Sequence, residues 1–273
     1  MLKDITLGQY YPGKSVLHRL DPRVKLGGTI VFVVSLFVFG SIASFALATI
    51  VLAALIVLSQ VPLRFMLRGL KTIFVLMVIT ALFNLFLTPG QVIWQFWKLK
   101  ITAEGVRVAI HMAVRLTYLI VGSSILTLTT TPNRLTDGIE TGLRPLQKIR
   151  IPVHEIAMMM SIALRFIPIL MDETDKIMRA QEARGADFSS GGLIRRAKAL
   201  VPLLVPLFVS AFRRANDLAL AMEARGYHGG SGRTKMKPLI YTGEDRTAWI
   251  LILLYVIAQV LVARFIPVST AFF

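Results

Sequence analysis

The length, composition and charge of this chain are those of a membrane protein. Its 273 residues are 55% hydrophobic with a mean hydropathy of +0.67, which is too apolar for an ordinary soluble domain. The net charge of +16 does not indicate nucleic-acid binding, because the basic residues flank apolar runs and do not share a face with aromatic residues. The absence of cysteine excludes disulfides and thiolate metal sites.

Apolar runs predict five membrane-spanning helices. They cover residues 26–39, 42–58, 72–87, 104–130 and 247–265. The first two are short for a span and are separated by Gly40-Ser41, so we expect a helical hairpin there. The loop after the third carries Trp94, Phe96 and Trp97, which are typical of the outer membrane interface.

Basic residues predict the orientation and the domain limits. They precede the first span and separate the second from the third, and the positive-inside rule places both groups in the cytoplasm. The polar start of the chain lacks the apolar core of a signal peptide. We therefore predict a cytoplasmic N-terminal strap (1–25), a membrane domain of four helices (26–131), a cytoplasmic and interfacial coupling domain (132–246) and a last transmembrane segment (247–273).

Two long, bent helices are predicted within residues 132–246. From Val153 to Glu182, apolar residues recur every three or four positions, and the second half of this stretch is charged. A second apolar run, Leu200 to Phe212, contains Pro202 and Pro206 and is shorter than the roughly 20 residues that a span needs. We expect both helices to begin at the membrane and to end in the cytosol. The predicted fold is an all-α membrane protein with about five transmembrane helices and a cytoplasmic coupling region of long bent helices.

The tripeptide Ala-Arg-Gly ends both of these helices. It occurs as Ala183-Arg184-Gly185 and again as Ala224-Arg225-Gly226, each time after a glutamate. One interpretation is structural, because glycine often ends a helix in a left-handed conformation and arginine suits the negative end of the helix dipole. The repetition favours a second interpretation, in which each guanidinium enters a groove on a partner and pairs bidentately with carboxylates. We therefore predict a protein-binding site at these two arginine tips.

A phosphate-loop pattern, G-x-x-x-x-G-K-[ST], lies near the start of the chain, from Gly8 to Ser15. A phosphate loop needs a buried strand before it and a long helix opening at its lysine. The preceding residues, 2–7, make a poor core strand, and Asp21-Pro22 breaks the chain soon afterwards. We therefore interpret the pattern as a turn-rich strap and not as a nucleotide site.

Two groups of side chains inside predicted helices, one ionisable and one of methionines, each allow two interpretations. His111 and Arg115 share one face of the fourth span, either as a functional pair at membrane depth or in a helix that starts beyond the bilayer with Arg107 reaching outward. The cluster Met158 to Met160 either fills a core or forms an adaptable binding surface. Because the four histidines are scattered, we predict no catalytic residue, metal site or cofactor.

Several motifs taken together are similar to those of one transporter family. They are Gly8-Gln9-Tyr10 to Ser15, His18-Arg19-Leu20-Asp21-Pro22-Arg23, Glu104-Gly105 with Thr129-Thr130-Thr131-Pro132, Leu164-Arg165-Phe166-Ile167-Pro168 and the two arginine tips. Through them the chain resembles the transmembrane T component of energy-coupling factor (ECF) transporters, a branch of the ABC importers for vitamins and metals. The resemblance extends over nearly the whole chain.

The resemblance implies a coupling subunit without enzymatic activity or cofactor in the bacterial cell membrane. Arg184 and Arg225, with their flanking alanines and glycines, would each anchor one of two cytosolic ATPase subunits. Two apolar regions, Ile156–Leu170 and Leu200–Phe212, would hold a membrane-embedded substrate-binding subunit, the S component. The candidate contacts to it are Met158, Met159, Ile162, Phe166, Leu203 and Leu207. A dedicated cobalt or nickel importer, a secondary transporter and a scaffold for another soluble machine are the alternatives to a vitamin importer.

Overall fold

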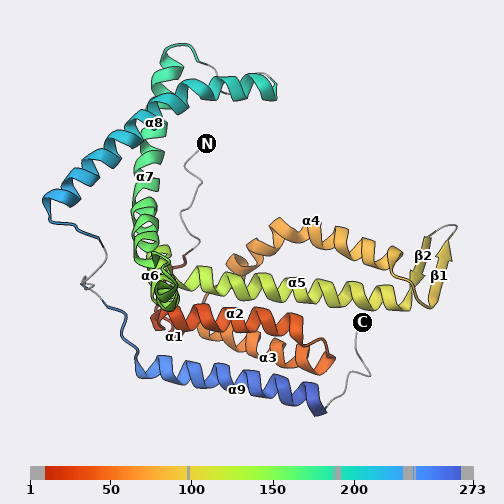
Figure 1. Cartoon of the computed structure of the whole chain (residues 1–273). Coiled ribbons are helices and arrows are strands. Elements are labelled where there is room, and N and C mark those ends of the chain that lie inside the picture. Colours follow the sequence, from red (N-terminus) through yellow and green to blue (C-terminus); the bar gives the residue numbers. More distant parts are fainter. Residues whose placement is uncertain are drawn as a thin grey trace. The chain divides into compact units, whose positions relative to one another are not determined.

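The described structure is almost entirely helical, which confirms the predicted all-α class. The computed structural model describes residues 10–96, 99–186, 188, 192–229, 236 and 238–265. The elements in chain order are α1 (Val16–Arg19), α2 (Pro22–Val38), α3 (Ile42–Ser59), α4 (Leu63–Leu87), β1 (Val92–Phe96), β2 (Leu99–Thr102), α5 (Ala103–Thr129), α6 (Pro132–Leu143), the 3-10 helix η1 (Arg144–Ile149), α7 (Val153–Ala183), α8 (Leu193–Ala224) and α9 (Gly243–Phe265) (Figure 1).

A short β-hairpin occupies the loop that the sequence places between the third and fourth spans. Its strands β1 and β2 pair antiparallel, with Val92 opposite Thr102 and Phe96 opposite Leu99. The aromatic and β-branched residues of both strands favour this pairing, but the segment is too short to predict with period-2 alternation alone. Trp97, predicted at the outer interface, lies outside the described residues.

Among the described residues, five helices are long and apolar enough to span a membrane, if the bent helix α4 counts as one span. The other four are α3, α5, α7 and α9. The prediction of about five spanning helices is therefore confirmed, but the members differ from those that the sequence suggested. Helix α2, which covers the predicted span 26–39, has only 17 residues, whereas α7, predicted at the interface, has 31.

The chain folds as two units. The membrane unit consists of residues 10–138 and 239–265, and the crossed-helix unit consists of Ile139–Pro238. Helices α2, α3, α5 and α9 enclose the core of the membrane unit, where Leu36, Ala48 and Leu128 are almost completely buried. Helices α2 and α9 approach closely at Gly27. A Cβ atom at this position would lie 2.8 Å from the ring of Trp249, so the close approach requires glycine.

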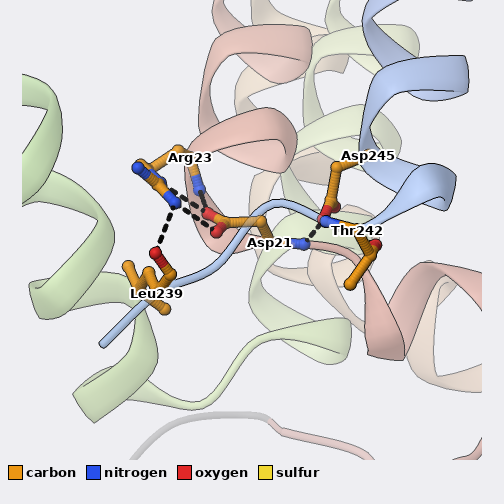
Figure 2. Close-up of polar contacts among 5 residues, drawn as sticks. All are labelled: Asp21, Arg23, Leu239, Thr242 and Asp245. Carbon is orange, nitrogen blue, oxygen red and sulfur yellow. Dashed lines mark hydrogen bonds and ion pairs between the residues drawn. The ribbon is translucent and has the colours of Figure 1, made fainter. Parts of the chain in front are cut away.

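A buried carboxylate ties the start of α2 to the start of α9. Asp245 is 1% exposed, and its Oδ1 accepts a hydrogen bond of 2.7 Å from the backbone nitrogen of Asp21 (Figure 2). Its Oδ2 accepts from the backbone nitrogen and the hydroxyl of Thr242, each at 2.7 Å. Asp21 in turn accepts from the guanidinium of Arg23, which also donates to the carbonyl of Leu239 at 3.2 Å. The junction therefore satisfies several backbone groups at the ends of two helices.

The hydrogen bonds at this junction also determine the charge of Asp245. Burial raises the pKa of its carboxyl, but the hydrogen bonds from the backbone of Asp21 and from Thr242 outweigh burial and hold the pKa below its usual value. Asp245 is the third residue of α9 and precedes the apolar run from Thr247 to Phe265, so the carboxylate lies at the polar end of this helix and not in its apolar part.

The phosphate-loop pattern folds into a turn that His18 closes. The Nδ1 atom of His18 lies 2.6 Å from the hydroxyl of Ser15, and its Nε2 donates to the carbonyl of Tyr11 at 2.9 Å. A Cβ atom at Gly13 would lie 2.7 Å from the His18 ring, so the ring itself accounts for this glycine. The helix that follows has four residues, which supports the strap interpretation; Gly8 lies outside the described residues.

Candidate functional site: the two arginine tips

The two predicted bent helices are α7 and α8, which cross within the crossed-helix unit (Figure 1). Pro168 lies inside α7, and Pro202 and Pro206 lie inside α8. Each proline lacks the N–H that would bond to the carbonyl four residues earlier, so each weakens its helix locally and favours a bend. The two arginine tips are the C-terminal ends of these helices.

The two tips have the same backbone conformation. Arg184 and Arg225 follow the last helical residues with φ/ψ angles of −90°/8° and −88°/9°. Gly185 and Gly226 come next, with φ angles of 85° and 72°. This is the left-handed helix ending that glycine favours, so the structural interpretation of the two glycines is confirmed.

Matching hydrogen bonds close both ends. In the first tip the backbone nitrogen of Ala186 donates to the carbonyl of Gln181 at 3.0 Å, and in the second that of Tyr227 donates to Met222 at 3.0 Å. In each case a backbone N–H donates to the carbonyl five residues earlier in the chain, so both helix ends are Schellman motifs. The carbonyls at the helix ends are thus occupied by backbone, which leaves the arginine side chains free for other contacts.

Both arginine side chains are exposed. In the described part of the chain neither guanidinium forms a hydrogen bond or an ion pair. Among the described residues, nothing lies within 4 Å of a Cβ atom built on Gly185 or Gly226, so these two glycines are not packed against a neighbour there. An exposed, unpaired guanidinium on a small-residue helix end can form bidentate hydrogen bonds with a partner's carboxylate.

We expect Gly185→Ala and Gly226→Ala each to destabilise its helix end by about 1 kcal/mol, because an L-residue is strained at these positive φ angles. The measurement is amide hydrogen exchange of the peptides that contain Ala186 and Tyr227, which should exchange roughly fivefold faster. Gly142→Ala is the control, because Gly142 lies inside α6 and a Cβ atom there meets nothing within 4 Å. Unchanged protection in both tip variants contradicts this expectation.

The predicted S-component contacts on α7 lie at the surface to different degrees. Met159 is 57% exposed, and Met158, Ile162 and Phe166 are half-buried. The methionine cluster is therefore not enclosed in a core, and Met159 in particular is available to a partner.

On α8 the structure exposes a different set of apolar residues from those chosen in the sequence. Of the two predicted contacts, Leu203 is only 6% exposed and Leu207 is half-buried. Leu203 lies next to a contact with α7, because the carbonyl of the preceding Pro202 accepts a hydrogen bond of 3.4 Å from the Gln181 side chain. The exposed apolar side chains of this stretch are Leu200, Val201, Leu204, Val205, Phe208, Val209 and Phe212. We call them the α8 apolar face. Their four-residue spacing was visible in the sequence, but a nearly all-apolar run does not indicate which side packs inward.

His111 and Arg115 lie on α5 and are buried in the membrane unit. Arg115 Nη2 and His111 Nε2 are 3.0 Å apart, and the His111 ring centre lies 4.3 Å from that of Phe45. Both side chains therefore belong to the packed bundle, whereas Arg107 is exposed. Among the described residues, no three His, Asp or Glu side chains gather as metal ligands would.

Comparisons with known proteins agree over most of the chain. Residues 13–236 match the family model described as CbiQ, cobalt transport protein. The chain is 52% identical to the energy-coupling factor transporter transmembrane protein EcfT of Thermosediminibacter oceani over 97% of this chain and 100% of that protein. It is 54% identical to EcfT of Ruminiclostridium cellulolyticum, over 90% and 92% of the two chains, and 48% identical to EcfT of Bacillus subtilis, over 96% and 98%.

Proposed function

Because this chain belongs to the family of transmembrane T components of energy-coupling factor transporters, we propose that it couples two cytosolic ATPases to a membrane-embedded S component. It is a multi-pass membrane protein of a transport complex. In our proposal it is non-catalytic: ATP is hydrolysed on the ATPase subunits, and the solute binds to the S component. In our proposal the N-terminus and the two arginine tips face the cytoplasm at the cell membrane.

The observation that carries the proposal is the pair of matched arginine tips. Two helices that cross in one unit end in the same Schellman motif and present an exposed guanidinium that pairs with no other described residue. Two equal anchors suit two similar partners, so each of Arg184 and Arg225 binds a groove on one ATPase through its carboxylates. The alanine before and the glycine after each arginine allow close approach of the partner's backbone.

The apolar surface of the same unit suits a partner within the bilayer. The α8 apolar face and Met159 present side chains that would be unfavourable in water and that fit either lipid or an apolar protein surface. In our proposal this surface, including Met158, Ile162 and Phe166, holds the S component. Motion of the anchored tips then reaches the S component through the helices, and a vitamin or another micronutrient is released into the cell.

One observation favours a second candidate function. The matching family model is described as a cobalt transport protein, so a dedicated cobalt or nickel importer is the alternative. The two candidates differ in the S component and the cargo, and not in the role of the tips. Identification of the membrane protein that co-purifies with this chain distinguishes them.

Reconstitution in proteoliposomes tests the proposal. We expect uptake of the cargo only when this chain, both ATPases and the S component are present together with ATP. Omission of this chain should abolish uptake while the isolated S component still binds its cargo. Uptake by this chain alone would contradict the proposal and support a secondary transporter instead.

A further inference from the structure

The helices α7 and α8 are equivalent over more than their tips. Arg225 lies 41 positions after Arg184, and the same offset relates Arg214 to Glu173. Glu173 in α7 and Arg214 in α8 therefore lie the same number of residues before the tip arginine of their own helix.

These two equivalent residues form an ion pair where the helices cross. Arg214 Nη2 and Glu173 Oε2 are 3.1 Å apart, and the side chains are 39% and 24% exposed. In the described part of the chain, the Nε atom of Arg214 is buried and has no hydrogen-bond partner, so Glu173 is the one acceptor seen for this guanidinium. An interaction between equivalent positions places the ion pair at the same distance along each helix from its tip.

A second contact at the crossing follows from the proline pattern. Pro206 has no N–H for the carbonyl of Pro202, which is four residues earlier, and this carbonyl accepts from the Gln181 side chain at 3.4 Å. Among the described residues, two polar contacts therefore join α7 to α8 at separate points. Two polar contacts at separate points specify which residues of the two helices face each other.

We infer that Glu173 and Arg214 are positioning residues that fix where α7 crosses α8 and so hold the two arginine tips at a set separation. Each tip lies eleven residues beyond its member of the pair, which is about 16 Å of helix on either side. A shift of the crossing by one helical turn along either helix would change the arm between the crossing and that tip, so the tips would no longer match two ATPases at once. A partly exposed ion pair adds little to overall stability, so we expect its loss to change the separation of the tips and not the unfolding of the unit.

The separation of the tips can be measured directly, because the chain contains no cysteine. Ala180 and Ala221 are exposed, occupy equivalent positions and lie four residues before the arginines. Spin labels on Ala180→Cys and Ala221→Cys in the full-length protein report the distance between the tips by pulsed dipolar spectroscopy. We expect one narrow distance distribution for the otherwise unchanged protein.

Charge reversal tests the pair. Glu173→Arg or Arg214→Glu alone should broaden and shift the distribution, and the double variant Glu173→Arg with Arg214→Glu should restore it. Asp172→Arg and Arg213→Glu are matched controls, because Asp172 and Arg213 are the exposed neighbours at equivalent positions. The inference is overturned if the single variants keep the narrow distribution, if the double variant stays broad, or if the controls broaden equally. Should a single variant fail to fold, Glu173→Gln takes its place under the same criteria.

The consequence for coupling rests on the proposed function, and a second readout separates the two. We expect Glu173→Arg to slow ATP-dependent uptake severalfold in proteoliposomes and the double variant to recover it. If the proposed function is wrong, the distance measurements keep the pattern above while ATPase binding does not depend on Arg184 or Arg225. If the positioning role is wrong, ATPase binding still requires both arginines but the distances do not respond to charge reversal.

Discussion

Replacement of both Arg184 and Arg225 by alanine should abolish co-purification of the two ATPases with this chain. We expect each substitution to cost about 2–5 kcal/mol at its ATPase contact, because a carboxylate buried in the partner's groove loses its charged partner. The lower limit already weakens that contact by roughly 30-fold. The measurement is the amount of each ATPase recovered on the tagged chain, with the single variants retaining one of the two contacts.

Two further variants separate the chemistry of the arginine from charge alone and from general damage. Arg184→Lys keeps the charge but loses the planar guanidinium, so we expect it to recover only part of the binding. Arg179→Ala removes an exposed arginine from the same helix, five residues before the tip, and should leave recovery unchanged. Recovery of both ATPases at the unsubstituted level with the double alanine variant would refute the anchoring role.

Asp245→Ala should destabilise the membrane unit by about 3 kcal/mol. The substitution leaves the backbone N–H of Asp21, the N–H of Thr242 and the Thr242 hydroxyl without their shared acceptor at a nearly fully buried site. Asp245→Asn should also destabilise, because its amide nitrogen cannot accept at the second oxygen position. The measurement is the thermal unfolding midpoint of the full-length protein in detergent.

The neighbouring residue provides the control for this variant. Glu244 forms an ion pair of 3.6 Å with Arg19, but both side chains are largely exposed, so Glu244→Ala should change the midpoint little. Equal midpoints for Asp245→Ala and Glu244→Ala would show that the buried junction does not stabilise the unit.

The lowered pKa of Asp245 gives this stabilisation a pH dependence. Since the pKa is lower in the folded than in the unfolded chain, the contribution is fully present above the unfolded value and is lost as the pH falls through the folded value. The difference in midpoint between the unsubstituted protein and Asp245→Ala should therefore shrink on acidification below about pH 4, where a free aspartate begins to be protonated. A difference that grows on acidification would contradict the assignment of the charged form.

Local signals in the sequence were sufficient for the class, the number of spans and the tips. Hydropathy, the glycine after each arginine and the proline positions all act within a window of a few residues or one helix, so they can be read without the fold. The repeated tripeptide could be recognised as a candidate binding site for the same reason. The motif-based resemblance to the T-component family is confirmed by the near-full-length similarity of the curated relatives.

The sequence by itself therefore determined that this is a helical membrane protein with two arginine-ended helices. Only the tertiary structure decided which residues meet: Asp21 with Asp245, which are 224 positions apart, and Glu173 with Arg214, which lie on different helices. It also decided that Leu203 is buried while Leu204 is exposed, although both are leucines in one apolar run. The reason is physical, because propensity and hydropathy depend on a residue's own neighbourhood, whereas contacts and burial depend on which distant segments the folded chain brings to it.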